Sequence, residues 1–108
     1  MNKHELFDLY KSVIKKPGGI SFIPHTVAHN FINDCIKHDF AIVGIDRFRL
    51  VNGTEPLEIA DFSDYKESSW EKYKMELAKF AIEFIDEFES EEGIYYDFVI
   101  VPKVEWKK

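Results

Sequence analysis

Apolar side chains recur every three or four positions in three stretches of the chain, and each stretch predicts an amphipathic helix. The first stretch spans residues 3–16, the second spans 26–38 and the longest spans 69–89. Pro17 and Gly18 follow the first stretch, and this combination ends helices. The longest stretch carries an aromatic-rich face formed by Trp70, Tyr73, Leu77, Phe80, Ala81, Phe84 and Phe88. We expect that face to pack on a sheet.

Three further stretches are rich in β-branched and aromatic residues and predict strands at residues 40–51, 57–62 and 95–101. The turn signal Asn52-Gly53 joins the first two strands as a hairpin. The third strand is almost continuously apolar, which predicts a central strand covered on both faces. The expected fold class is therefore α+β: a three-stranded, mostly antiparallel sheet packed with three helices in the order ααββαβ. We expect the last strand beside the first.

Asp46 interrupts the apolar face of the first predicted strand, and a charge on such a face is costly unless it is paired. A β-bulge at Gly44 would turn Asp46 outward, and this is the favoured interpretation. Alternatively, Asp46 pairs with a cation such as Arg47 or Arg49. A functional aspartate at the rim of the sheet is the third possibility.

Residues 1–108 are one domain's worth of chain, long enough for a single core without disulfides or metal. The net charge of −6 disfavours nucleic acid as a partner. Residues 1–54 hold seven Lys/Arg and five Asp/Glu, a net of +2, and residues 55–108 hold seven Lys and fifteen Asp/Glu, a net of −8. The second half therefore carries the acidity.

The location expected from the sequence is the cytoplasm. Cys35 is the single cysteine and cannot form an internal disulfide, which fits a reducing compartment. The chain begins with an amphipathic pattern instead of the apolar core of a signal peptide, and no apolar run approaches a membrane span. We expect neither a membrane partner nor a cofactor.

A histidine- and cysteine-rich stretch, H-x3-H-x5-C-x2-H, comprises His25, His29, Cys35 and His38. His25 and His29 could share a helix face, as paired zinc ligands do. On the same helix, however, Cys35 lies about 120° from His29, and His38 about 140° from His25. One continuous helix therefore cannot close these four side chains around an ion, and no metal site is expected.

A second candidate site is catalytic and consists of carboxylates at or near strand ends: Asp46, Asp61, Asp64 and Asp97. Such carboxylates hold Mg²⁺ or Mn²⁺ in metal-dependent hydrolases. The alternative function is therefore a small metal-dependent hydrolase using Asp46, Asp61 and Asp97. The sequence contains no nucleophile elbow, phosphate-binding glycine loop or H-E-x-x-H motif, so the main expectation is a protein that is not an enzyme.

The third candidate site is an acidic cluster around the end of the longest helix: Glu83, Asp86, Glu87, Glu89, Glu91, Glu92 and Asp97. Carboxylates at a helix C-terminus are unfavourable, because that end is already partly negative. The cluster is either a solvated face or a surface for a basic partner. A second acidic set flanks the hairpin: Glu55, Glu58, Asp61, Asp64 and Glu67. The residues expected to contact the partner are Asp61, Asp64, Glu83, Asp86, Glu87, Glu91, Glu92 and the aromatic Tyr95.

The segment Ala41-Ile42-Val43-Gly44-Ile45-Asp46, the Asn52-Gly53 turn, Ile59-Ala60-Asp61-Phe62-Ser63 and the aromatic helix together resemble small immunity proteins of bacterial polymorphic toxin systems, contact-dependent growth inhibition among them. The resemblance covers about residues 40–101. It implies a protein, monomeric when free, that neutralises one cognate toxin domain. Such toxins are often nucleases with basic clefts. The positive charge of residues 1–54 departs from fully acidic members and leaves the mode of blockade open.

Overall fold

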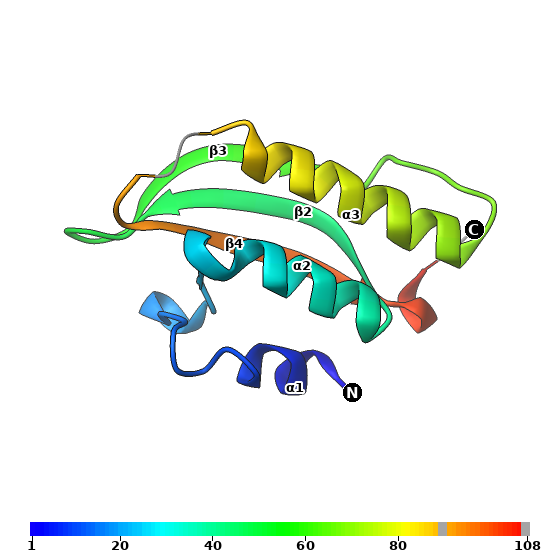
Figure 1. Ribbon diagram of the computed structural model, residues 1–108, viewed down its shortest axis with the longest axis horizontal. Helices are drawn as coiled ribbons and strands as arrows, with labels where there is room; N and C mark the ends of the chain where they lie inside the picture. Colours follow the sequence, from blue (N-terminus) through cyan, green and yellow to red (C-terminus); the bar gives the residue numbers. More distant parts are fainter. Residues whose placement is uncertain (89–90, 107–108) are drawn as a thin grey trace.

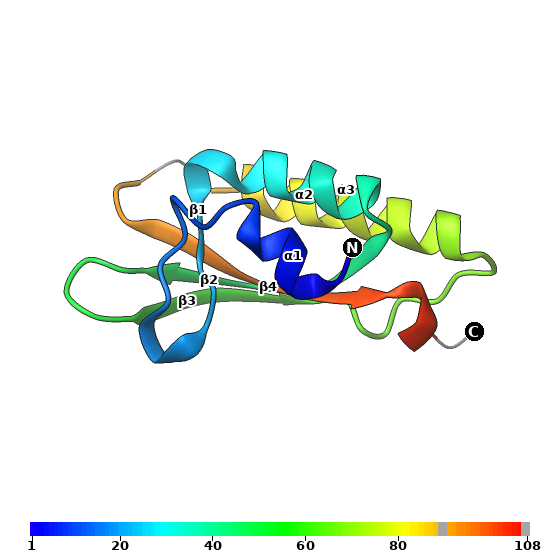
Figure 2. The same cartoon turned by 90° about the horizontal axis from the view of Figure 1, so that it is seen from below.

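The computed structural model describes residues 1–88 and 91–106 as an α+β fold built on a four-stranded antiparallel sheet (Figure 1). The strands are β1 (Ile23–Pro24), β2 (Phe40–Arg49), β3 (Glu55–Asp61) and β4 (Ile94–Pro102). The helices are α1 (Lys3–Asp8), α2 (Ala28–Lys37) and α3 (Trp70–Asp86), with 3-10 turns η1 (Pro17–Gly19), η2 (His25–Val27) and η3 (Lys103–Glu105). Helices α2 and α3 lie side by side on one face, while no α-helix of the described residues covers most of the opposite face (Figure 2).

The strand order is β1-β4-β2-β3. The last strand, β4, lies beside β2, which is the first of the three expected strands, so that expectation is correct. The expected number of three strands is wrong. The missed strand, β1, has only two residues, and Pro24 supplies no N–H. It pairs with Tyr95 and Tyr96 of β4. A strand of two residues is too short to show a periodic pattern in the sequence. It is defined by its pairing with the edge of β4.

The helices are shorter than the apolar pattern predicts. Helix α1 starts with a reciprocal cap in which Asn2 Oδ1 accepts from the Glu5 N–H and Glu5 Oε1 accepts from the Asn2 N–H, both at 2.9 Å. It ends at Asp8, and the chain continues in turns with i→i−3 hydrogen bonds. Helix α3 begins after Ser69, whose hydroxyl accepts from the Lys72 N–H. The expected end of α3 at residue 89 lies outside the described residues.

A β-bulge decides which way the side chains of β2 point. Ile42 pairs with Ile100, and Gly44 pairs with the adjacent Val99. Val43 is therefore an extra residue in β2 without a partner of its own in β4. Phe40, Ile42 and Ile45 consequently point into the core under the helices. Asp46 points to the opposite face, in agreement with the bulge interpretation of the sequence.

Strand β4 is central, as expected, but it is not covered on both faces. Its side chains alternate: Ile94, Tyr96, Phe98 and Ile100 are buried beneath the helices. Asp97 and Val99 point the other way, and both are partly exposed. A nearly continuous apolar pattern therefore occurs in a strand that the described residues cover fully on one side and only partly on the other.

Candidate functional site

Three aspartates gather on the helix-free face of the sheet, which we call the open face. Asp46 of β2 lies directly opposite Asp97 of β4 in the strand register. Asp61 of β3 pairs with Gly44, which lies two residues before Asp46 in β2. The side chain of Asp61 therefore points to the same face of the sheet as that of Asp46. The bulge in β2, the alternation of β4 and the alternation of β3 between Ile59 and Asp61 together bring the three carboxylates to one surface.

The aspartates of the open face differ in their electrostatic state. Burial raises the pKa of Asp46, and the nearby charge of Asp61 raises it further. Burial also raises the pKa of Asp97, with the charge of Asp46 adding to the effect. Hydrogen bonds from Ser63, including its backbone N–H at 2.9 Å, lower the pKa of Asp61. Within residues 1–88 and 91–106, no Lys or Arg forms an ion pair with any of the three.

Exposed aliphatic side chains lie beside these carboxylates. Ile59 is 71% exposed and Val99 is 47% exposed, although both belong to strands. With Asp46 and Asp61 they line a shallow pocket of about 270 Å³ that also includes the backbone of Gly44. Because Gly44 has no side chain, the floor of the pocket is flat and accessible to a partner.

The end of the open face nearest the β2–β3 turn is covered by the chain itself. Residues 15–22 run beneath the sheet, and Lys15 and Phe22 form an isolated bridge there (Figure 2). Phe22 packs edge-on against Phe48 with ring centroids 4.9 Å apart. The Lys15 ammonium lies 5.0 Å from the Tyr95 ring centre. The expected contact residue Tyr95 is therefore on the same face as the aspartates but lies against the protein's own lysine.

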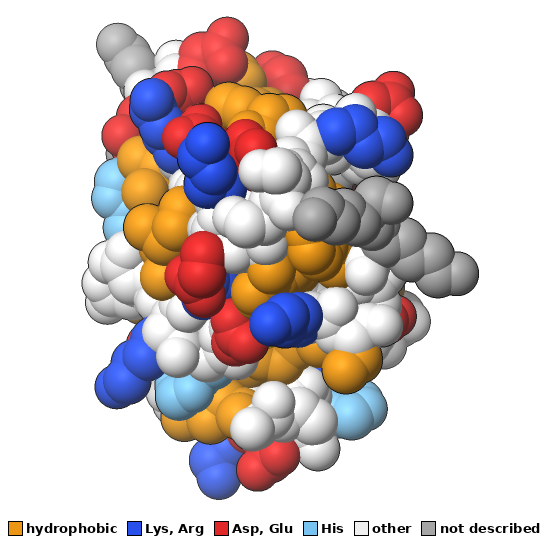
Figure 3. All heavy atoms as spheres, turned by 90° about the vertical axis from the view of Figure 1, so that its right-hand side faces the viewer, with side chains coloured by type: hydrophobic (Ala, Val, Ile, Leu, Met, Phe, Trp, Pro, Cys, Tyr) orange, Lys and Arg blue, Asp and Glu red, His pale blue; other side chains and the backbone are white. Residues whose placement is uncertain are grey.

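A second, aromatic pocket adjoins the open face at the opposite end of the sheet. It has a volume of about 230 Å³ and shares Val43 and Ser63 with the first pocket. Its remaining lining residues are Tyr65, Lys66, Glu67, Tyr73, Val101, Glu105 and Trp106. Figure 3 views this end of the molecule and shows hydrophobic side chains reaching the surface between charged ones.

The acidic residues at the end of α3 form a separate surface on the helix layer. The expected contact residues located there, or in the loop that follows, are Glu83, Asp86, Glu87, Glu91 and Glu92. All are exposed. His29 Nε2 lies 2.8 Å from Asp86 Oδ1, and Arg49 donates to Glu91 Oε2 at 2.6 Å. Part of this acidity is therefore compensated within the protein. Glu89 lies outside the described residues.

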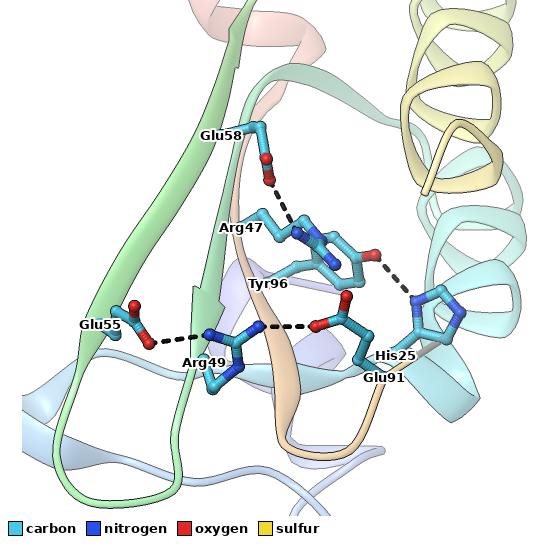
Figure 4. Close-up of polar contacts among 7 residues, drawn as sticks. All are labelled: His25, Arg47, Arg49, Glu55, Glu58, Glu91 and Tyr96. Atoms are coloured by element: carbon cyan, nitrogen blue, oxygen red, sulfur yellow. Dashed lines mark hydrogen bonds and ion pairs between the residues drawn. The ribbon is translucent and has the colours of Figure 1, made fainter. Parts of the chain in front are cut away.

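Acidic residues of the hairpin also have partners inside the molecule (Figure 4). Arg49 donates to Glu55 at 3.0 Å, and the buried Arg47 donates to Glu58 at 2.8 Å. The Arg47 guanidinium also lies 4.5 Å from the Phe88 ring centre. These contacts join the hairpin to the end of α3, which indicates a structural role for this polar group.

His25 belongs to the same polar group, since its Nδ1 lies 2.8 Å from the hydroxyl oxygen of Tyr96 (Figure 4). Burial lowers the pKa of His25, with the charges of Arg47 and His29 adding to the effect. In the described residues, no three His, Cys, Asp or Glu side chains are placed to hold a metal ion. Asp46, Asp61 and Asp97 share a face, but they do not form such a group.

The structure divides the expected contact residues between surfaces. Asp61 joins Asp46 and Asp97 on the open face, Asp64 is exposed in the following loop, and the acids at the end of α3 lie on the helix layer. Sequence reasoning missed Ile59, Val99 and the aromatic pocket. The available signal was the apolar pattern of β4, which is typical of a strand covered on both faces.

The described part of the chain contains no helix long and apolar enough to cross a membrane. Comparison of the chain with protein-family models, curated proteins and solved structures gave no match.

Proposed function

We propose that this protein binds and neutralises a basic protein, namely a cognate toxin domain of a bacterial polymorphic toxin system, through an acidic surface. The observation that carries the proposal is the open face of the sheet. There Asp46, Asp61 and Asp97 lie beside exposed aliphatic side chains and have no paired Lys or Arg among the described residues.

The apolar content of the open face supports a protein partner. Val99 remains exposed between the buried Phe98 and Ile100, and Ile59 is exposed on the edge strand β3. Apolar groups at the centre of a surface and charges around them are typical of protein–protein interfaces. A partner that covers this face would complete the two-sided burial that the β4 pattern favours.

The charge of the open face supports a basic partner. Two carboxylates directly opposite on neighbouring strands repel each other, and partial burial adds a desolvation cost. A Lys or Arg side chain placed between Asp46 and Asp97 would relieve both costs. Complementary charge would also accelerate the encounter of the two proteins.

The same charges argue against self-association through this face. A symmetric dimer would place Asp46, Asp61 and Asp97 of one copy near the same residues of the other. Like-charge contacts of this kind disfavour an interface. The acids at the end of α3 are a weaker candidate surface, because Asp86 and Glu91 already contact His29 and Arg49.

The test is an affinity capture from cells that make the protein, with three tagged baits. The first bait is the unaltered protein. The second carries Asp46→Asn, Asp61→Asn and Asp97→Asn, which remove charge but keep side-chain shape. The third carries Glu83→Gln, Glu87→Gln and Glu92→Gln, a matched loss of three charges at the end of α3 and in the loop that follows it. Captured toxin activity is then assayed with and without each bait.

We expect one stoichiometric partner that carries a basic toxin domain. The first and third baits should bind and inhibit this partner, and the second bait should fail to retain it. Retention of that partner by the second bait, with loss from the third, would move the interface to the end of α3. Absence of any toxin whose activity the protein suppresses would refute the inhibitor function itself.

A further inference from the structure

The aromatic pocket is built from three segments that are distant in the sequence. Tyr73 comes from the first turn of α3, Tyr65 from the loop that precedes it, and Trp106 from the residue after η3. The rings of Tyr65 and Tyr73 are stacked with centroids 6.1 Å apart, and those of Tyr73 and Trp106 are 5.5 Å apart. The three rings thus form a row, with Tyr73 in the middle.

Carboxylates stand beside this row of rings. Glu67 accepts hydrogen bonds from the Tyr65 hydroxyl at 3.0 Å and from the Ser68 backbone N–H at 2.8 Å. Glu105 is exposed and also lines the pocket. Aromatic faces attract cations through their quadrupole, and carboxylates add direct charge attraction. The combination favours an ammonium or guanidinium group.

The size of the pocket limits its occupant. Its volume of about 230 Å³ is below the roughly 300–1,000 Å³ of sites for drug-sized ligands. One extended side chain suits it better than a cofactor. Val43 and Ser63 connect it to the pocket of the open face, so a partner seated on the aspartates reaches both.

The described part of this chain places no cation of its own over these rings. The two cation–ring contacts within residues 1–88 and 91–106 are Lys15 over Tyr95 and Arg47 over Phe88, and both lie elsewhere. Lys66 lines the pocket, but it contacts neither a ring in this manner nor a carboxylate within ion-pair distance.

We propose that the aromatic pocket receives an arginine or lysine side chain of the protein that docks on the open face. The inference rests on the proposed function for the source of that side chain. A cationic side chain inserted among aromatic rings near the centre of an interface is typical of a binding hot spot. The aspartates would then guide the partner to the face, and the pocket would fix its register.

The test uses small probes and no toxin, so it separates this inference from the proposed function. Isotope-labelled protein is titrated with N-acetyl-arginine methylamide and with its uncharged isostere N-acetyl-citrulline methylamide, followed by NMR. We expect the arginine probe to cause a saturable shift of the Trp106 indole signal. The backbone amide of Glu83, which lies on α3 away from the pocket, is the internal reference. An equal response to citrulline, or none to arginine, would overturn the inference.

Two variants locate the probe. Tyr65→Leu removes one ring and Glu105→Gln removes one charge, and each should weaken arginine binding about two- to fivefold. Glu83→Gln is the control, since it removes one exposed charge on α3 away from the pocket. If both pocket variants bind as tightly as the unaltered protein, the site is wrong.

A chain shortened to end at Trp106 tests a competing occupant, the protein's own Lys107 and Lys108. Equal arginine affinity of the two chains supports a partner's side chain. Binding that appears only after shortening would mean that the chain's own lysines fill the pocket, and the inference would fail. Whatever the result with these probes, the affinity capture tests the inhibitor function separately.

Discussion

Asp46 and Asp97 face each other across β2 and β4 on the open face, and each carboxyl has its pKa raised. For both residues burial is the main cause, and a neighbouring carboxylate is the second. A folded protein that holds protons more tightly than its unfolded chain becomes less stable as the pH rises. This pair therefore costs stability in the free protein at neutral pH.

We predict that Asp97→Asn stabilises the free protein at pH 7 by about 0.2–1 kcal/mol, because it removes the cost of burying a charge and the cross-strand repulsion from Asp46. Since the folded pKa is raised, the cost is absent below the ordinary aspartate pKa of 3.8. It grows as the pH rises from that value through the raised folded pKa. Urea unfolding between pH 3.5 and pH 7 should show the variant gaining stability over the unaltered protein with rising pH.

Asp61→Asn is the matched control for the same face, with the opposite expected sign. Hydrogen bonds from Ser63 lower the pKa of Asp61, so its charged form contributes stability above the ordinary pKa. The asparagine variant should be less stable than the unaltered protein at pH 7. If Asp61→Asn and Asp97→Asn changed stability in the same direction, the assigned electrostatic states would be wrong.

Asp39 gives a second prediction, because it joins the end of α2 to the start of α3. Its Oδ1 accepts from Trp70 Nε1 at 2.7 Å and from the buried Lys74 Nζ at 2.9 Å. Asp39→Ala should destabilise the fold by about 1–3 kcal/mol, because it leaves a buried ammonium with Glu71 as its remaining partner. Thermal and urea unfolding measure the loss.

The backbone of Asp39 calls for a control, since its φ of 67° lies in the left-handed region. Asp39→Asn keeps a side chain that tolerates this conformation and accepts from Trp70, but it lacks the charge. It should lose less stability than Asp39→Ala. The hydrogen bonds from Trp70 and Lys74 lower the pKa of Asp39, so the stability it contributes is present above pH 3.8 and falls below it. The asparagine variant should lose this pH dependence.

Local sequence patterns predicted much of the fold, for reasons visible at single residues. The conflict between Asp46 and the apolar face of its strand indicated the bulge beside Gly44. Asn52 and Gly53 indicated the hairpin, because both favour tight turns. The order of the three longer strands followed from connection rules. Each of these features depends on neighbours in sequence or on general topology.

The candidate site could be predicted only in part, because its geometry depends on long-range contacts. Glu91 and Asp86 looked uncompensated in sequence, yet their partners Arg49 and His29 come from distant elements. The aromatic pocket likewise combines segments that no local pattern connects. The exposure of Val99 could not be foreseen, since a strand's pattern does not tell whether the chain itself or a partner covers each face.

Gly93 gives a third prediction, because it enters β4 with φ of 80° and its carbonyl accepts from the Leu50 N–H at 2.8 Å. A Cβ at this position would lie 2.7 Å from Val51 Cγ2. Gly93→Ala should therefore cost about 1–3 kcal/mol from backbone strain and overpacking. Gly18→Ala is the control, with a similar φ of 66° and no atom within 4 Å of the added Cβ. Urea unfolding should rank Gly93→Ala as the more damaging.

Combining Gly93→Ala with Val51→Ala separates the two causes. If the contact with Val51 contributes, the double variant should be more stable than the sum of the two single effects predicts. Strict additivity would show that backbone strain alone is responsible.

The metal question gives a fourth prediction. A docking surface needs no cation, so Mg²⁺ or Mn²⁺ added to the free protein should give no stoichiometric heat in calorimetry. A divalent ion bound between Asp46 and Asp97 would neutralise their mutual repulsion, so this pair is where such an ion would bind. Tight binding of one ion, abolished by Asp97→Asn, would favour the metal-dependent hydrolase alternative.

The rate of complex formation gives the last prediction, once the toxin partner is in hand. Association steered by complementary charge slows as salt screens it, since the Debye length falls from about 10 Å at 0.1 M to about 3 Å at 1 M. The unaltered protein should therefore associate much more slowly at high salt in stopped-flow measurements.

Replacing Asp46, Asp61 and Asp97 with Asn should lower the association rate at low salt and flatten its salt dependence. The change from Glu83, Glu87 and Glu92 to Gln removes as many charges, so it controls for net charge alone. If both triple variants flattened the salt dependence equally, the effect would belong to the overall charge of the protein. A larger effect of the open-face variant would locate the steering charges on the sheet, where a cation of the partner would reduce the repulsion between Asp46 and Asp97.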